Sequence, residues 1–372
     1  MKRRQLGSAR RIVVKVGTTL LTADSGEIHS RRFGSLAADI AALLDERREV
    51  VLVSSGAVGL GMHKLGLDRR PSSIPEVQAA AAIGQIDLCR RFERAFANHD
   101  RSIGQILLTH GGLADRERFL NARRTLQSLL GSGAVPVVNE NDSVSTEELR
   151  FGDNDQLSAM VVNCCSADLL IMLTDIDGLH DQHPSKPEAE RIAEVAQVDR
   201  KILGLATNST SNLSLGGMRS KLEAARLASL SGVAVVIADG RKGGVLGRII
   251  AGEDLGTLIH PATDRLSSRK HWIAYSLKPR GSLRLDAGAV RAIRDQGRSL
   301  LPIGVLGTSG RFKVGDLVSL EDERGREIAR GLASYDVRDL ERIKGQKTRR
   351  ISELLGYSNG SAAIHRDDLV LL

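Results

Sequence analysis

Short runs of β-branched and other apolar residues recur along the first 260 residues and alternate with helical patterns. Such near-continuous apolar runs are typical of strands that are buried on both faces of a sheet. The alternation therefore predicts a mainly parallel sheet that is sandwiched by helices. The predicted strands occupy residues 12–16, 50–53, 106–109, 135–138, 169–173 and 233–237.

The segment between the first two predicted strands carries the pattern of one helix face. Its apolar residues recur with the i, i+3, i+4, i+7 spacing of an amphipathic helix, and a charged run at residues 45–48 follows them. The order is thus strand, helix, strand. The apolar positions are Phe33, Leu36, Ala37, Ile40, Leu43 and Leu44.

Polar or glycine-rich segments follow five of the predicted strands. In an open α/β sheet the carboxyl ends of parallel strands face the ligand crevice, so these segments are expected to converge on one site. They comprise residues 17–19, 54–57, 139–142, 174–178 and 238–240.

An acidic run with interspersed asparagines occupies residues 137–159. Carboxylates so close together repel unless something cationic lies among them, and Asn adds directed donors and acceptors for a polar ligand or a hydrated metal. A solvated acidic loop is the alternative interpretation. The carboxylates are Glu140, Asp142, Glu147, Glu148, Asp153 and Asp155.

Three segments combine features that suit phosphate binding. Lys15 precedes a glycine turn at Gly17, residues 54–59 place hydroxyls at a predicted helix start, and residues 214–221 form a glycine-rich turn before a helix. A solvent-exposed strand-end lysine and a plain helix cap are the alternatives for the first two. Neither the P-loop pattern nor the protein kinase signatures occur in the sequence.

The pattern changes after residue 263. A polar and basic segment with Trp272 leads into short alternating stretches at residues 281–285 and 316–320, with glycine-rich turns predicted at 304–310 and 324–325. This pattern predicts a linker followed by a small β-barrel-like domain.

The length and composition favour a soluble protein of two domains. A length of 372 residues favours two domains, and 41% hydrophobic with 26% charged residues is ordinary for a soluble protein. No apolar run reaches the roughly 20 residues of a membrane helix. Three cysteines without CxxC spacing favour a reducing cytoplasm, and the basic N-terminus is expected to be a frayed tail.

The formal net charge of +8 is concentrated toward the C-terminal portion, which permits contact with nucleic acid. With 3% aromatic residues, however, the sequence offers no stacking platform for bases.

Seven motifs follow one another along the chain: V-K-V-G-T at 14–18, S-S-G-A at 54–57, R-E-R-F-L-N-A-R at 116–123, V-N-E-N-D at 138–142, G-D-N-D at 152–155, T-D at 174–175 and G-G-M at 216–218. In this order they resemble the glutamate 5-kinases of the amino acid kinase superfamily. Residues 282–286, 301–304 and 312–318 resemble a PUA domain, a module shared with RNA-modifying enzymes. The resemblance implies a kinase domain at residues 1–262, a linker at 263–278 and a PUA domain at 279–372.

The resemblance also implies an activity and its residues. ATP would phosphorylate the γ-carboxylate of L-glutamate, the first step of proline biosynthesis, with proline as feedback inhibitor and a homodimer or homotetramer as the assembly. Ser55, Asp142 and Asn154 would bind glutamate, and Lys15 and Lys221 would be catalytic. The nucleotide-binding set would be Lys15, Thr174, Asp175, Leu215, Gly216, Gly217, Met218, Arg219, Ser220 and Lys221.

Two positions depart from the family pattern: Leu215 stands where Thr is common, and His180 stands where Tyr is common. Either Asp153 or Asp155 is expected to support Mg²⁺, directly or through water. Residues 56–76 are expected to act as a mobile cover. The alternative function is RNA binding through the PUA domain, which we do not favour because the kinase reaction has no RNA substrate.

Overall fold

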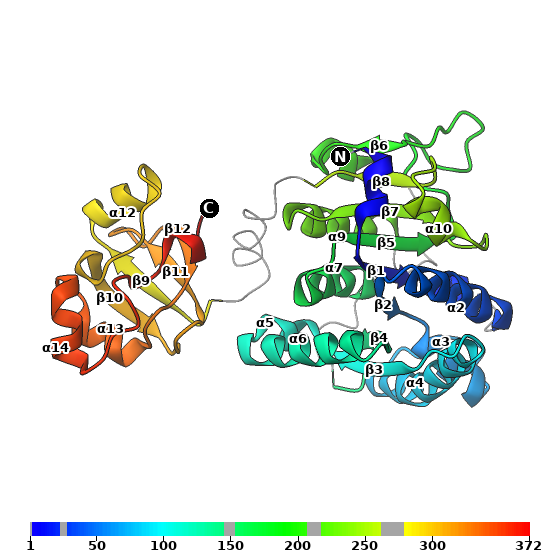
Figure 1. Cartoon of the computed structure of the whole chain (residues 1–372), viewed down its shortest axis with the longest axis horizontal. Helices are drawn as coiled ribbons and strands as arrows, with labels where there is room; N and C mark the ends of the chain where they lie inside the picture. The colour runs from blue at the N-terminus through cyan, green and yellow to red at the C-terminus, as the bar shows by residue number, and fades with distance from the viewer. Residues whose placement is uncertain (1, 23–27, 145–152, 207–216, 262–278) are drawn as a thin grey trace. The chain divides into compact units, whose positions relative to one another are not determined.

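The computed structural model describes the whole chain except residues 1, 23–27, 145–152, 207–216 and 262–278 (Figure 1). The chain divides into one compact unit of residues 1–112 and 120–263 and a second of residues 113–119 and 264–372. The predicted linker, with Trp272, lies outside the described residues, and so do Glu147 and Glu148.

The first unit is built on a sheet whose eight described strands have the order β3-β4-β2-β1-β5-β7-β8-β6 (Figure 1). Pairing is parallel from β3 to β7, as the apolar runs predicted. All six predicted strands are present. They are β1 (Arg11–Val16), β2 (Glu49–Ser54), β3 (Ile103–Leu108), β4 (Val135–Glu140), β5 (Leu169–Thr174) and β7 (Ala234–Asp239).

Two short strands at one edge of this sheet were not predicted. β8 (Thr257–Ile259) pairs antiparallel with β7, and β6 (Glu194–Val195) pairs with β8. Strands of two or three residues are too short to show a period in the sequence, so their existence depends on the pairing partner.

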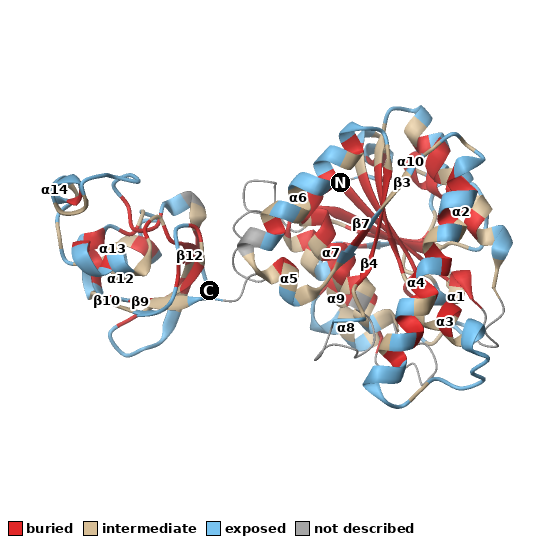
Figure 2. Ribbon diagram, turned by 90° about the horizontal axis from the view of Figure 1, so that it is seen from below, coloured by how far each residue is buried: buried red, intermediate tan, exposed pale blue. Residues whose placement is uncertain are grey.

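Helices cover both faces of the sheet, and the buried strands lie between them (Figure 2). Helices α2 and α10 pack together on one face, and α7 and α9 pack together on the other. The helices are α1 (Thr18–Leu21), α2 (Ser30–Asp45), α3 (Ala57–Leu65), α4 (Ile74–Ala97), α5 (His110–Ala114), α6 (Arg116–Gly131), α7 (Asp153–Cys165), α8 (Arg200–Leu205), α9 (Met218–Leu230) and α10 (Val245–Ile250).

The described N-terminal segment packs against the first unit, and the prediction of a frayed tail was wrong. Residues Arg3–Ser8 form the 3₁₀ helix η1, and Leu6 is fully buried. The Arg3 guanidinium donates hydrogen bonds to the carbonyls of Ala193, Leu255 and Gly256 at 2.6, 2.8 and 2.9 Å. Because these carbonyls belong to distant segments, nothing in the local sequence marks Arg3 as buried.

The second unit contains a sheet whose described strands have the order β10-β9-β11-β12-β13. The stretch at 304–310, predicted as a turn, is mostly strand β10, because it pairs antiparallel with β9 despite its glycines. The strands are β9 (Gly281–Leu285), β10 (Val305–Gly310), β11 (Leu317–Glu321), β12 (Glu327–Leu332) and β13 (Leu369–Leu371).

Helices that the sequence did not indicate pack beside this second sheet, and the unit has its own apolar cluster between Leu283 and Leu369. The helices are α12 (Ala287–Arg294), α13 (Val337–Ile343) and α14 (Ile351–Leu355), with short 3₁₀ turns η3 (Pro302–Gly304), η4 (Thr348–Arg350) and η5 (Arg366–Asp368). Across the described parts of both units, no helix combines the length and hydropathy needed to cross a membrane.

Candidate active site

Two buried lysines from distant segments meet at one carboxylate. Lys15 lies in the central strand β1 and Lys221 in the first turn of α9, and their ammonium groups flank Asp155 near the start of α7. Lys15 Nζ is 2.5 Å from Asp155 Oδ1, and Lys221 Nζ is 3.5 Å from Asp155 Oδ2. The Ser220 hydroxyl donates to Asp155 Oδ2 at 2.5 Å. One carboxylate therefore fixes the spacing of two cations.

Burial and charge act together on this cluster. Asp155 is 1% exposed, and burial alone would raise its pKa, but the charges of Lys15 and Lys221 outweigh burial and hold the pKa below its usual value. Burial and the neighbouring Lys15 lower the pKa of Lys221, against the attraction of Asp155. Asp155 thus stays ionised, and its negative charge stabilises the ammonium groups beside it.

A chain of amides links the strand ends next to the lysines. Asn154 Nδ2 donates to Ser55 Oγ and to Asn139 Oδ1, both at 3.0 Å, and Asn139 Nδ2 donates to Gln85 Oε1 at 2.7 Å. Asn154 Oδ1 is buried without a hydrogen-bond partner among the described residues. An unpaired buried acceptor of this kind is costly, which marks it as a place for a ligand donor.

A second acidic group lies at the end of β4. Glu140 is 3% exposed, and the half-buried Asp142 follows two residues later. Burial first, and then the charge of Glu140, raise the pKa of Asp142 to about 6, while Arg70 acts in the opposite direction. His110 Nδ1 lies 3.3 Å from Glu140 Oε2. Among the residues that the structure describes, Glu140 and Arg70 are thus the charged groups that act on Asp142, the predicted substrate residue.

Only part of the predicted nucleotide-binding set can be placed. Thr174 ends β5 and donates to Asp175 Oδ1 at 3.1 Å, and Gly217 and Met218 open helix α9. Arg219 is exposed and pairs with Glu223 at 3.0 Å, so it points away from the lysines. Leu215 and Gly216 lie outside the described residues.

His180, which stands where Tyr is common in the family pattern, contacts a neighbouring carboxylate. Its Nε2 lies 2.7 Å from Asp177 Oδ1, within the loop that follows β5. The imidazole is therefore held within its own loop.

Two residues, Asp153 and Asp155, are predicted to support Mg²⁺, and the structure describes the side chain of Asp155 but not that of Asp153. Asp153 is the first residue of α7, and its side chain is not described. Asp155 already contacts both lysines. Among the described residues, no group of three or more His, Cys, Asp or Glu side chains is arranged to hold a metal.

The predicted cover, residues 56–76, contains a rigid helix. Gly56 adopts a left-handed φ of 108° and starts α3, which packs against α4 at glycines. A Cβ at Gly61 would lie 1.7 Å from the Ala80 carbonyl oxygen, and one at Gly84 would lie 1.8 Å from that of Ala57. Backbones this close leave α3 little freedom. The exposed connection at residues 66–73 is the part that stays a candidate cover.

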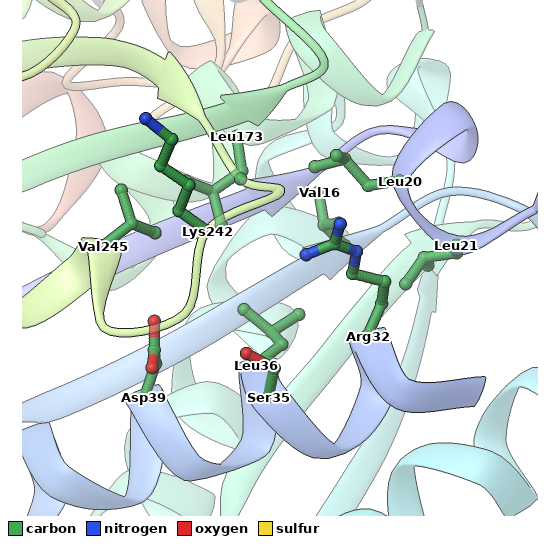
Figure 3. A pocket seen from close by; sticks show the side chains of 11 residues that line it. Val16, Leu20, Leu21, Arg32, Ser35, Leu36, Asp39, Leu173, Lys242 and Val245 are labelled. Carbon is green, nitrogen blue, oxygen red and sulfur yellow. The ribbon is translucent and has the colours of Figure 1, made fainter. Parts of the chain in front are cut away.

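A pocket opens on the opposite face of the sheet, beside α2 and α10 (Figure 3). Val16 lines it, and since Val16 follows Lys15 in β1, the two side chains point to opposite faces. Asp39, also in the lining, accepts a hydrogen bond from the Gly244 amide at 2.8 Å, at the start of α10. This pocket is therefore separate from the lysine pair.

Some of these residues gave no signal in the sequence. Gln85 reaches the site from α4, away from any strand end. His110 opens α5 directly after the predicted strand at 106–109, at a strand end that the five predicted segments did not include. Asn139 and Glu140 did lie in such a segment, within the acidic run, but only their contacts separate them from their neighbours.

Comparison with known proteins identifies the families to which the two parts of the chain are similar. The profile described as "Amino acid kinase family" matches residues 10–239, and that of the PUA domain matches residues 281–355. A solved carbamate kinase from Giardia lamblia, bound to AMP-PNP, superposes with a TM-score of 0.50 at 14% identity, over 68% of this chain and 99% of that one. At this identity the likeness shows the fold alone.

Full-length relatives are much closer in sequence. A glutamate 5-kinase of Methylococcus capsulatus is 48% identical over 370 residues, covering 99% of both chains. One of Syntrophotalea carbinolica is 47% identical over 372 residues, covering 100% of both, and one of Chromohalobacter salexigens is 49% identical over 368 residues, covering 99% of this chain and 97% of that one. The chain therefore belongs to the glutamate 5-kinases of the amino acid kinase family, with a PUA domain in its C-terminal part.

Proposed function

We propose that this protein transfers the γ-phosphoryl group of ATP to the γ-carboxylate of L-glutamate, giving L-glutamyl 5-phosphate for proline biosynthesis. Identity of 47–48% to glutamate 5-kinases over essentially the whole chain supports this reaction. The single structural observation that carries it is the pair of buried lysines held at one carboxylate.

The geometry suits a reaction that needs positioning and charge more than proton transfer. A glutamate side chain has a pKa near 4.3 and is already ionised at neutral pH, so the nucleophile needs no general base. The obstacle is repulsion between an anionic nucleophile and the phosphates of ATP. Lys15 and Lys221 would neutralise the oxygens of the transferring group, and Asp155 would hold their spacing.

The amide chain and Asp142 form the proposed glutamate end of the site. Asp142 supplies a carboxylate for the α-ammonium group, and the unpaired Asn154 Oδ1 supplies an acceptor. Ser55 lies within hydrogen-bond distance of Asn154, so it belongs to the same cluster. The substrate's amino group would thereby donate to Asn154 Oδ1, an acceptor that is buried and costly to leave unpaired.

Mg²⁺ would accompany ATP and neutralise phosphate charge, as it does in phosphoryl transfer generally. Asp155 fits poorly as its direct ligand, because a divalent cation there would face two ammonium groups. We therefore assign Asp155 to the lysines and leave Asp153 as the proposed carboxylate for Mg²⁺. Feedback inhibition by proline, a homodimeric or homotetrameric assembly and a cytoplasmic location stay predictions from the family.

The test is formation of ADP with Mg-ATP and L-glutamate, with the acyl phosphate trapped as a hydroxamate. Aspartate and N-acetylglutamate serve as control substrates. Glutamate should support turnover, and the two controls should support far less. Turnover with another amino acid but not with glutamate would keep the fold and discard the substrate, and RNA affinity without glutamate-dependent ADP release would favour the RNA-binding alternative.

A further inference from the structure

His110 and Glu140 are brought together by the register of two strands. Leu108, the last residue of β3, pairs with Glu140, the last residue of β4. The Asn141 amide donates to the Leu108 carbonyl at 2.7 Å, which ties the two strand ends together. His110 starts α5 two residues beyond Leu108, and its Nδ1 lies 3.3 Å from Glu140 Oε2. The contact is thus set by backbone pairing.

The Glu140 carboxylate is buried in an environment that disfavours its negative charge. Its side chain is 2% exposed, and neither carboxylate oxygen has a hydrogen bond among the described residues. A buried ionised carboxylate without hydrogen bonds is strongly disfavoured unless a cation lies beside it. His110, whose side chain is 15% exposed, is the basic group at ion-pair distance.

The charge of Glu140 matters because Asp142 follows it. Repulsion from Glu140 adds to burial in raising the pKa of Asp142, and Arg70 from the connection between α3 and α4 opposes both. Within the described part of the chain, the charged groups identified at this end of the site are His110 from α5, Glu140 from β4 and Arg70 from the α3–α4 connection. A proton on Asp142 would remove the charge that attracts the substrate's ammonium group.

We propose that His110 is a positioning residue for glutamate binding: it holds and neutralises the Glu140 carboxylate, so that Asp142 keeps its negative charge for the α-ammonium group. His110 itself does not contact the substrate in this scheme. The inference rests on the proposed role of Asp142 at the glutamate end of the site.

The scheme makes the role of His110 depend on Glu140. Without His110, the unpaired charge of Glu140 would act on Asp142 in full, and protonation of Asp142 would compete with glutamate. When residue 140 carries no charge, the loss of His110 should cost little. A merely structural role for His110 would show no such dependence.

The experiment measures kcat and the KM values for glutamate and ATP in the full-length enzyme between pH 6 and pH 9. The variants are His110→Ala, His110→Asn, His110→Arg, Glu140→Gln and the double variant His110→Ala/Glu140→Gln. If the loss of His110 raises the pKa of Asp142 by about one unit, the ionised fraction of Asp142 falls about fivefold at pH 6 and about twofold at pH 7. His110→Ala should therefore raise the glutamate KM by about these factors and leave it almost unchanged at pH 9. It should change kcat and the ATP KM little, the sign of lost ground-state binding.

Two further results are expected. His110→Arg should restore the glutamate KM more fully than His110→Asn, because Arg keeps the cation and Asn keeps only a donor. The double variant should have the glutamate KM of Glu140→Gln alone. A glutamate KM unchanged by His110→Ala, or an equal rise in the Glu140→Gln background, would overturn the proposal.

The variant Asp142→Ala separates the proposed role of Asp142 in glutamate binding from the proposed role of His110. If Asp142→Ala leaves the glutamate KM unchanged, the proposed glutamate end of the site fails. If it raises that KM while His110→Ala does not, only the role of His110 fails. Thermal melting of each variant identifies any that does not fold. If His110→Ala does not fold, the comparison of the glutamate KM between His110→Asn and His110→Arg tests the proposal instead.

Discussion

At the scale of single residues, Asp155 is the organising group of the proposed site. It is almost completely buried, and ion pairs with two lysines together with a hydrogen bond from a serine hydroxyl stabilise its negative charge. Removing one member of such a cluster leaves uncompensated charge, so its members should depend strongly on one another.

Asp155→Asn should lower kcat by roughly 10²–10³, because displaced lysines no longer meet the charge that develops during transfer. The KM for glutamate should change little. Ser220→Ala, which removes one hydrogen bond to the same carboxylate, is the milder control. Steady-state kinetics at several Mg²⁺ concentrations checks both, and recovery of Asp155→Asn at high Mg²⁺ would instead support a metal-binding role for Asp155.

From the raised pKa of Asp142 we expect glutamate binding to depend on pH. Its pKa is raised to about 6, so it is mostly protonated below that pH and ionised above it. An ammonium ligand favours the ionised form, so kcat/KM for glutamate should fall by about tenfold per pH unit below pH 6. Asp142→Asn should bind glutamate weakly and lack this inflection near pH 6. An unaltered inflection in Asp142→Asn would assign the titration to another group.

At the scale of elements, the pair α3 and α4 shows how a helix start is fixed beside the site. Ser55 and Gly56 follow the end of β2 and lead into α3, and glycines let α3 lie directly against the backbone of α4. The same α4 carries Gln85, the last member of the amide chain. Packing of α3 on α4 thus positions Ser55 and Asn139 together.

Gly84→Ala should destabilise the protein by several kcal/mol, since its Cβ would lie 1.8 Å from the Ala57 carbonyl oxygen. Gly34→Ala is the matched control, because Gly34 lies within α2 and has no atom within 4 Å of an added Cβ. The control should be neutral or stabilising by up to ~1 kcal/mol. Denaturant unfolding measures both, and equal stabilities for the two variants would contradict the close packing of α3 on α4.

At the scale of the whole molecule, each of the two compact units has an apolar core of its own. The core of the first unit extends from Leu6 to Leu258, and that of the second from Leu283 to Leu369. Tyr335 is fully buried in the second core, and its hydroxyl donates to the Gly360 carbonyl at 2.5 Å. A unit with its own apolar core is expected to fold by itself.

The fragment of residues 279–372 should therefore unfold cooperatively in a thermal melt. Leu320→Ala, at a fully buried position, should cost the fragment about 2–5 kcal/mol. Leu301→Ala, at a position 40% exposed, is the control and should cost much less. A fragment without a cooperative transition would contradict an independent domain. A salt-sensitive mobility shift of structured RNA by the fragment would favour the RNA-binding alternative.

The sequence by itself determined the strands of the parallel sheet and the segments that follow them. A strand buried on both faces must be apolar throughout, so its composition shows in a single sequence, as for β1, β5 and β7. The order of the motifs also indicated the family, and the resemblance implied the candidate residues Lys15, Lys221, Ser55 and Asn154.

Tertiary structure alone decided the features that depend on contacts between distant segments. The burial of Arg3, the strand β10 and the edge strands β6 and β8 each depend on a partner far along the chain. The same holds for the position of Asp155 between two lysines and for the contact of His110 with Glu140. Local patterns record whether a residue is apolar, but they do not record which distant charge or carbonyl it will meet.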